Sequence, residues 1–175
     1  MPPTGEGPRP PRPPPARGGA RDGAAAGPCE GAALSGSELV VLVGLQGSGK
    51  STWVREHLAA THTVVSKDHW PNARHREARQ QRVVAELLAE GRSVVVDNTS
   101  PVPEDRAPLV AAARAAGVGV RAVWLDTPVP VCAARNDARE GRARVPPAGL
   151  YGTAARFVPP STAEGFDRVD VVTAG

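Results

Sequence analysis

Apolar and polar positions alternate in two different ways along residues 38–175. Short runs of β-branched apolar residues are typical of buried strands, and the longer stretches between them carry apolar residues at helical spacing. The strand-like runs lie at 38–43, 63–66, 93–97, 118–125 and 169–172. The helix-like stretches lie at 51–60, 72–90, 103–116 and 128–140. Because strands that alternate with helices form right-handed βαβ crossovers, we expect a three-layer α/β fold with a parallel sheet of about five strands.

The first 37 residues lack this pattern and consist largely of proline, glycine, alanine and arginine. Such a segment cannot bury enough apolar surface to offset the entropy lost on ordering, so we expect residues 1–37 to be a disordered tail. Its arginines could contact nucleic acid or an SH3-like partner, although a solvated tail or a misassigned start codon is the simpler interpretation. The folded domain is then expected at residues 38–175.

The motif GLQGSGKS at residues 44–51 lies between the first predicted strand and the first predicted helix. It matches the phosphate-binding P-loop, and both flanking elements that this motif needs are present. We therefore expect a P-loop NTPase fold in which Lys50 contacts the β- and γ-phosphates of ATP and the hydroxyl of Ser51 binds Mg²⁺. The predicted nucleotide-binding residues are Gly44, Gln46, Gly47, Ser48, Gly49, Lys50, Ser51 and Thr52.

Two carboxylates follow predicted strands at the edge of the sheet where ligands bind in such folds. Asp68 follows the second strand and could accept the proton of an incoming hydroxyl, although capping the next helix is an equally good interpretation. Asp97 ends the third strand, which we expect to be buried beside the P-loop strand. This is the Walker-B arrangement, so Asp97 is predicted to hold Mg²⁺ together with Ser51. Asn98, which follows, could orient phosphate or substrate.

Arginines are concentrated in two stretches of the chain. The fourth strand ends at Asp126-Thr127, either of which could cap the following helix. On or after that helix lie Arg135, Arg139, Arg142 and Arg144, and the second stretch contains Arg74, Arg76, Arg79 and Arg82. We expect at least one arginine of the first stretch to close from a mobile lid on the negative charge of phosphoryl transfer, with a solvated helix face as the alternative. The second stretch could line a groove for a phosphate backbone or form an ordinary surface.

Composition limits the classes of protein that fit. The 175 residues carry a formal net charge of +3 and only 3% aromatic residues, so the core must consist mainly of valine, leucine and alanine. A basic chain fits anionic partners such as nucleotides or nucleic acid. Cys29 and Cys132 are the only cysteines, which predicts no disulfide and suits the cytoplasm. No apolar run approaches the roughly 18 residues of a membrane span.

The segments GLQGSGKST, VVSKDHW, VVVDNTSPVPEDR and EGFDRV together resemble the kinase module of 5′-hydroxyl polynucleotide kinases, over about residues 38–172. In broader terms the chain is similar to AAA-type ATP-binding proteins. The resemblance implies an adenylate-kinase-like fold with ATP and Mg²⁺, Asp68 as the base that activates the 5′-hydroxyl, and Arg135 or Arg139 as the lid arginine. The sequence departs from that family at Ser66-Lys67, where Asn-Arg is expected. It also contains no DxDGT motif, so we expect no 3′-phosphatase activity from this chain.

These observations favour an ATP-dependent phosphotransferase that moves the γ-phosphate of ATP to a hydroxyl group. The leading acceptor is the 5′-hydroxyl of a polynucleotide. A small-molecule hydroxyl, as in P-loop kinases of sugars, antibiotics or metabolites, is the second hypothesis. The third, from another class, is a nucleotide-binding switch or ATPase without an acceptor, in which Asp68 would have no task.

Overall fold

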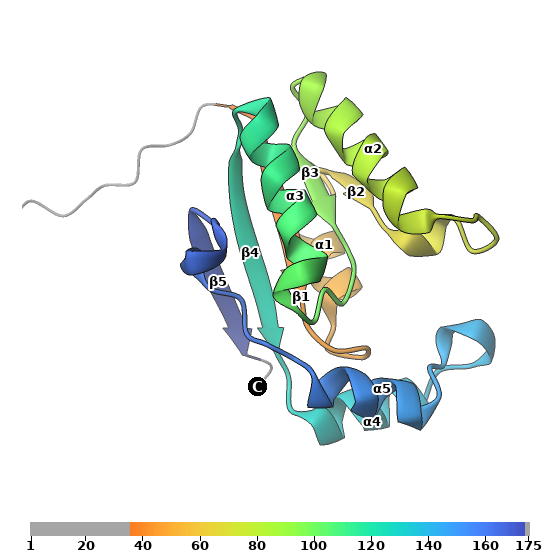
Figure 1. The fold of residues 1–175 in the computed structure, drawn as a ribbon. Coiled ribbons are helices and arrows are strands. Elements are labelled where there is room, and N and C mark those ends of the chain that lie inside the picture. The colour runs from red at the N-terminus through yellow and green to blue at the C-terminus, as the bar shows by residue number, and fades with distance from the viewer. Residues whose placement is uncertain (1–35, 174–175) are drawn as a thin grey trace, which may run out of the picture. The chain divides into compact units, whose positions relative to one another are not determined.

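Five parallel strands form the centre of the fold in the computed structural model, which describes residues 36–173 (Figure 1). The strands are β1 (Glu38–Val43), β2 (Thr63–Val65), β3 (Val94–Val96), β4 (Gly119–Asp126) and β5 (Arg168–Thr173), in the order β2-β3-β1-β4-β5. All four neighbouring pairs are parallel, which confirms the predicted sheet. The predicted tail lies outside the described residues except for its last two positions.

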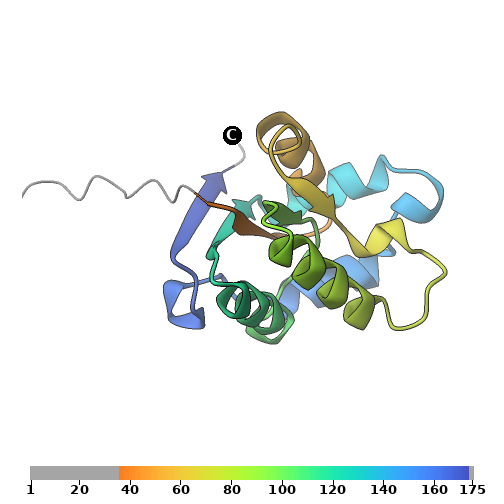
Figure 2. The same cartoon turned by 90° about the horizontal axis from the view of Figure 1, so that it is seen from above.

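Helices cover both faces of the sheet (Figure 2). They are α1 (Lys50–His57), α2 (Arg76–Ala89), α3 (Pro103–Ala116), α4 (Val129–Asp137) and α5 (Pro147–Ala155). Alternate side chains of β1 point to opposite faces. Leu39, Val41 and Val43 pack with residues of α2 and α3, whereas Val40 and Leu42 pack with residues of α1. Each helix among the described residues is too short or too polar to cross a lipid bilayer.

The helix boundaries differ from the sequence predictions in three places. Helix α1 ends at His57 rather than at residue 60, and α2 begins at Arg76 rather than at residue 72. A turn occupies the start of the predicted second helix, and it brings Trp70 back against α2, where the guanidinium carbon of Arg79 lies 5.1 Å from the Trp70 ring centroid. Helix α4 is shorter than predicted and ends at Asp137.

Helix α5 was not predicted, and it packs beside α4 at the carboxyl ends of the strands (Figure 1). Leu150 of α5 is buried against Leu45 of the P-loop and Cys132 of α4. Cys132 is a buried free thiol, and Cys29 lies outside the described residues. The hairpin of α4 and α5 therefore lies where the P-loop begins.

Candidate active site

Lys50 is bound by the P-loop itself. Its ammonium group donates hydrogen bonds to the carbonyl oxygens of Gly44 at 2.9 Å and Leu45 at 2.8 Å. The side chain is buried, and this burial lowers the pKa of Lys50 from its usual 10.5 to about 8, although the nearby carboxylate of Asp97 opposes the shift. A charged group placed in this way is ready to exchange backbone oxygens for phosphate oxygens.

The P-loop is packed tightly against the segment that follows β4. Gly47 has φ 82°, and a Cβ atom at this position would lie 2.4 Å from the carbonyl oxygen of Cys132. The hydroxyl of Thr127 donates a hydrogen bond to the carbonyl oxygen of Ser48 at 3.0 Å. The prediction that Asp126 or Thr127 caps α4 is therefore wrong, because the cap residue is Pro128 and makes no side-chain bond. Thr127 supports the P-loop instead.

Ser51 and Asp97 lie together at the start of α1. The hydroxyl of Ser51 donates a hydrogen bond to Oδ2 of Asp97 at 2.6 Å. Strand β3 pairs with β1, as the sequence predicted, and this pairing brings Asp97 beside the P-loop. A hydroxyl and a carboxylate side by side are the oxygen ligands that Mg²⁺ prefers. These two residues therefore fit the predicted ion.

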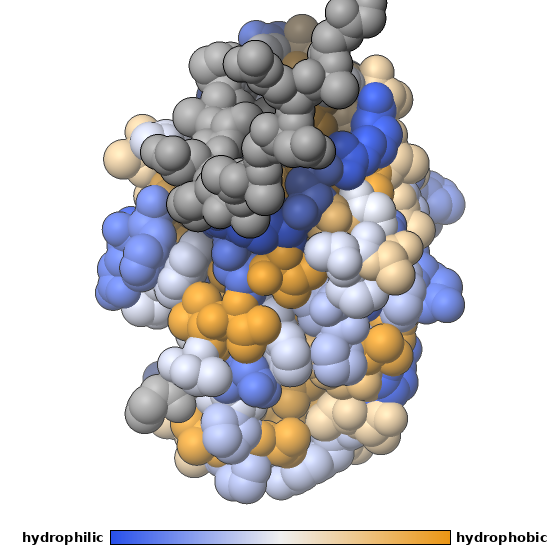
Figure 3. Space-filling view, turned by 90° about the vertical axis from the view of Figure 1, so that its left-hand side faces the viewer, coloured by the Kyte–Doolittle hydropathy of each residue, from blue (hydrophilic) through white to orange (hydrophobic). Residues whose placement is uncertain are grey.

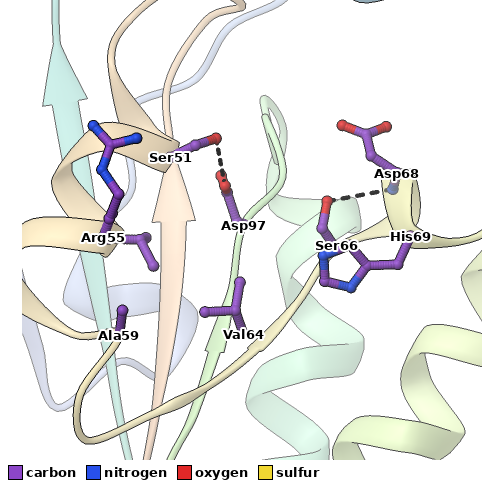
Figure 4. A pocket seen from close by; sticks show the side chains of 9 residues that line it. Ser51, Arg55, Ala59, Val64, Ser66, Asp68, His69 and Asp97 are labelled. Carbon is purple, nitrogen blue, oxygen red and sulfur yellow. Dashed lines mark hydrogen bonds between the residues drawn. The ribbon is translucent and has the colours of Figure 1, made fainter.

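Asp68 lies on the opposite side of a pocket from the Ser51–Asp97 pair (Figure 4). It belongs to a short 3₁₀ helix, η1 (Lys67–His69), whose N-cap is Ser66. The Ser66 hydroxyl accepts a hydrogen bond from the Asp68 backbone N–H at 3.3 Å. Asp68 is therefore not the helix cap that the sequence allowed. Its exposed carboxylate lines a pocket of about 320 Å³.

The remaining walls of this pocket come from α1 and β2. Arg55 of α1 and Ala59, which follows that helix, line the pocket together with Val64 of β2, and His69 follows Asp68 (Figure 4). The sequence analysis did not identify Arg55 as a site residue, although it lies one helical turn after Ser51 on α1 and so shares its face. The pocket thus combines carboxylates, one arginine and a small apolar surface.

Two of the four candidate lid arginines, Arg135 and Arg139, lie near the P-loop. A guanidinium nitrogen of Arg135 lies 3.8 Å from where a Cβ atom on Gly49 would be. The charge of Arg139 contributes to the lowered pKa of Lys50. Both side chains are exposed and form no ion pair within residues 36–173. Arg144, by contrast, pairs with Asp137 at 3.1 Å.

Two further residues support the site and were not predicted to do so. Gln80 of α2 is 1% exposed and accepts a hydrogen bond from the Asn98 side chain at 2.7 Å. The side chain of Asn136 in α4 donates a hydrogen bond to the carbonyl oxygen of Val145 at 2.7 Å and accepts one from the Val145 N–H at 2.9 Å. Gln80 lies four residues before Val84 on the buried face of α2, and this polar residue at a core position was the available signal.

Curated proteins match most of the length of this chain. A curated bifunctional polynucleotide phosphatase/kinase from Schizosaccharomyces pombe (strain 972 / ATCC 24843) is 29% identical over 139 residues, which cover 77% of this chain and 33% of that protein. The chain thus spans about a third of the length of the curated relatives it matches.

Solved structures share the fold at low sequence identity. A sugar kinase from Janibacter sp. HTCC2649 has a TM-score of 0.59 and 20% identity, covering 78% of this chain and 85% of that chain. A fungal RNA kinase has a TM-score of 0.58 and 15% identity, covering 78% of this chain and 74% of that chain. At these identities the similarity shows a common fold alone, that of small P-loop kinases.

The family comparison covers most of the described residues. A family model described as an AAA domain matches residues 39–160, which include the P-loop, Asp68, Asp97, Arg135 and Arg139. The match extends over more than half of the chain and over every candidate site residue. The chain therefore belongs to this AAA domain family.

Proposed function

We propose that this chain transfers the γ-phosphoryl group of ATP to a hydroxyl group, and that the acceptor is the 5′-hydroxyl of a polynucleotide. The observation that carries the proposal is the position of Asp68, whose carboxylate lies across a pocket from the Ser51–Asp97 pair (Figure 4). There a carboxylate can take the proton of a hydroxyl that enters beside the P-loop. A nucleotide-binding switch without an acceptor has no use for this group.

Each group at the site has one task in this reaction. Lys50 leaves the carbonyl oxygens of the P-loop and holds the β- and γ-phosphates. Asp68 accepts the hydroxyl proton while the acceptor oxygen forms its bond to the γ-phosphorus and the bond to the β-phosphate oxygen breaks, which releases ADP. Arg135 and Arg139 stabilise the charge on the transferred group. Mg²⁺, when bound at Ser51 and Asp97, supplies positive charge beside the phosphates.

The basic stretch at 74–82 supports a polynucleotide acceptor. Helix α2 contacts η1, so its exposed arginines begin close to the acceptor pocket. The Arg79 guanidinium lies over the Trp70 ring, and His69 meets that ring edge-on at a centroid distance of 6.3 Å. Cationic and aromatic groups together suit a phosphate backbone and its bases. The similarity to a curated polynucleotide phosphatase/kinase points the same way.

The size of the pocket favours a small hydroxyl compound as the second candidate acceptor. The pocket encloses about 320 Å³ and includes apolar side chains of Val54, Ala59 and Val64. A volume near the lower end for small-molecule sites fits a sugar or metabolite. The sugar kinase of the same fold makes this class worth testing.

Transfer of label from γ-labelled ATP tests the proposal. Oligonucleotides with a 5′-hydroxyl, as DNA and as RNA, would be offered to the wild type and to Asp68→Asn. We expect label on the oligonucleotide with the wild type and a loss of at least about 10²-fold in the variant, because positioned bases contribute 10²–10⁴-fold. The variant should still bind ATP.

Other outcomes separate the alternatives. Label that appears only on small hydroxyl compounds would replace the polynucleotide by the second candidate. ATP hydrolysis without any acceptor, unchanged in Asp68→Asn, would favour a switch or ATPase and contradict the proposal.

A further inference from the structure

The side chain of Asn98 links the segment that carries Asp97 with the segment that carries Asp68. It follows Asp97 in the chain, and its Oδ1 accepts a hydrogen bond from the backbone N–H of Lys67 at 3.3 Å. Lys67 directly precedes Asp68. On its other side, Nδ2 of Asn98 donates a hydrogen bond to Oε1 of Gln80 at 2.7 Å. One amide group therefore links the end of β3 with η1 and α2.

Gln80 completes the hydrogen bonds of this amide. It is 1% exposed and lies on the same face of α2 as the core residues Val84 and Leu88. The backbone N–H of Lys67 can only donate, so the amide oxygen of Asn98 faces it and the NH₂ group of Asn98 faces α2. There Oε1 of Gln80 accepts, and because a buried oxygen without a donor is costly, Gln80 holds the Asn98 amide in the position that bonds to η1.

The backbone of η1 has few other anchors. The Asp68 N–H bonds to the hydroxyl of Ser66, and the N–H groups of His69 and Trp70 bond to carbonyls within the same turn. Among residues 36–173, the bond from Lys67 to Asn98 is the only hydrogen bond that joins the backbone of 66–70 to a residue outside 66–73. The ion pair of Lys67 with Glu77 adds only a contact between partly exposed side chains.

We propose that the Gln80–Asn98 pair positions Asp68 for proton abstraction by fixing η1 at a set distance from the Ser51–Asp97 pair. The inference rests on the proposed function, since it assigns positioning residues to that reaction. Neither Gln80 nor Asn98 lines the pocket, so neither contacts the reacting atoms. Their effect passes through the Lys67 peptide.

Gln80→Met tests this role because it keeps an unbranched side chain and removes the acceptor oxygen. Gln80→Glu is the rescue variant, since its carboxyl group keeps an oxygen in the same place. Gln81→Met is the matched control, because Gln81 is the neighbouring half-buried glutamine and makes no side-chain hydrogen bond with the described residues. All variants would be made in the full chain and checked for thermal unfolding.

Three measurements apply to each variant. They are hydrogen exchange of the backbone amides of 66–70, the Kd for a non-hydrolysable ATP analogue, and kcat for transfer to a 5′-hydroxyl oligonucleotide. In Gln80→Met we expect exchange at 66–70 about tenfold faster and kcat about 10- to 100-fold lower, because small misplacements of catalytic groups have effects of this size. The Kd should stay within about twofold, and Gln80→Glu should recover kcat to within about threefold of the wild type.

The exchange measurement keeps this inference separate from the proposed function. If the wild type transfers no label, the proposed function fails, and faster exchange at 66–70 still shows that the pair fixes η1. Unchanged exchange in a folded Gln80→Met contradicts the inference whatever the activity. A weaker Kd that matches the loss of kcat, or a kcat within twofold of wild type, also contradicts it. Should Gln80→Met fail to fold, Asn98→Ala, at a half-buried position, is measured in the same way.

Discussion

At the scale of single residues, the burial of Lys50 should make the proposed ATP binding depend on pH. Its pKa of about 8 lies below the usual 10.5, so between these pH values the unfolded chain holds a proton that the folded chain lacks. The free energy of unfolding should therefore rise with pH in that window. Bound phosphates favour the ammonium form of Lys50, so ATP binding should take up a proton near pH 8. Above that pH, the affinity for ATP should fall by up to about tenfold per pH unit.

Calorimetry in two buffers of different ionisation enthalpy measures this proton uptake. Lys50→Arg is the control, because a guanidinium keeps its proton over the whole range and should bind ATP without uptake near pH 8. Binding by the wild type with no proton exchange at pH 8 would show that Lys50 is not the group whose ionisation is coupled to the nucleotide.

Gly47 gives a second prediction at this scale. Its φ of 82° disfavours a side chain, and a Cβ atom would meet the Cys132 carbonyl oxygen at 2.4 Å. Since backbone cannot move aside cheaply, Gly47→Ala should displace the P-loop from α4 and weaken binding of an ATP analogue by more than about tenfold, or 1.4 kcal/mol. Gly91→Ala is a matched control, because Gly91 has a similar φ of 73° and a Cβ atom there would have no neighbour within 4 Å. It should lose stability but bind the analogue normally.

The sequence predicted the residues of this site unevenly. Lys50, Ser51 and Asp97 were predictable because a local motif and a buried strand fix their backbone positions before any tertiary contact is known. Thr127 and Gln80 were not, because each acts through one partner more than 15 residues away in the chain, the carbonyl of Ser48 and the amide of Asn98. A pattern along the chain carries no information about such a pairing.

At the scale of elements, α5 shows where hydrophobic periodicity fails as a signal. Its sequence, PAGLYGTAA, has two glycines and little helical patterning. Packing forms the helix instead, because Leu150 is buried against Leu45 and Cys132. Pro147 also starts the helix without losing a hydrogen bond. The segment in which the sequence predicted a mobile lid therefore includes the helix α5, whose Thr153 accepts a hydrogen bond from the Gln46 side chain at 3.3 Å.

Asn136 should control the order of the loop between α4 and α5. It is 1% exposed and bonds to both backbone groups of Val145, closing the segment that carries Arg139. Asn136→Ala should leave these two groups without their partner and lower the free energy of unfolding by about 1–3 kcal/mol. Urea unfolding measures this loss, and label transfer should fall as well because Arg139 is no longer held.

The matched control is Arg144→Ala in the same loop. Arg144 pairs with Asp137, but both side chains are more than half exposed, so its loss should cost less than about 1 kcal/mol. Equal losses in the two variants would mean that Asn136 is no more important to the loop than a surface ion pair.

At the scale of the whole molecule, polar groups gather at both ends of the strands. The candidate site occupies the carboxyl ends. At the opposite ends Glu38 accepts hydrogen bonds from Arg121, and Arg121 also pairs with Asp170, so β1, β4 and β5 are linked there. Figure 3 shows apolar and polar residues interspersed over one side of the molecule. Val171 of the edge strand β5 is one of the exposed large apolar residues. The alternation of strand-like and helix-like segments predicted the sheet because each strand has its own apolar run. The position of β5 beside β4, by contrast, depends on contacts that no local pattern encodes.

Arg106 of α3 connects the segment before this helix with the segment after α5. Its side chain is completely buried and binds Glu164 through two hydrogen bonds of 2.7 Å. The same guanidinium donates to the carbonyl oxygens of Ser100 at 2.9 Å and Val158 at 3.1 Å. Ser100 has φ 42° and follows Thr99, whose carbonyl accepts the Gly44 N–H at 3.1 Å. A chain of contacts thus runs from the P-loop through Arg106 to the segment after α5.

Arg106→Met should be the most destabilising of these substitutions, because it leaves Glu164 unpaired at 14% exposure and two carbonyl groups without a donor. Breaking a buried pair in this way costs about 3–5 kcal/mol, measured as the free energy of unfolding in urea. The double variant Arg106→Met with Glu164→Gln removes the stranded charge while keeping a side-chain oxygen for the Ser161 N–H, so it should recover part of that loss. Arg82→Met is the surface control, since its pair with Glu86 is long and exposed and should contribute less than about 1 kcal/mol. If the double variant is no more stable than Arg106→Met, the loss of stability comes from the missing hydrogen bonds to the carbonyl oxygens of Ser100 and Val158 rather than from the unpaired charge of Glu164.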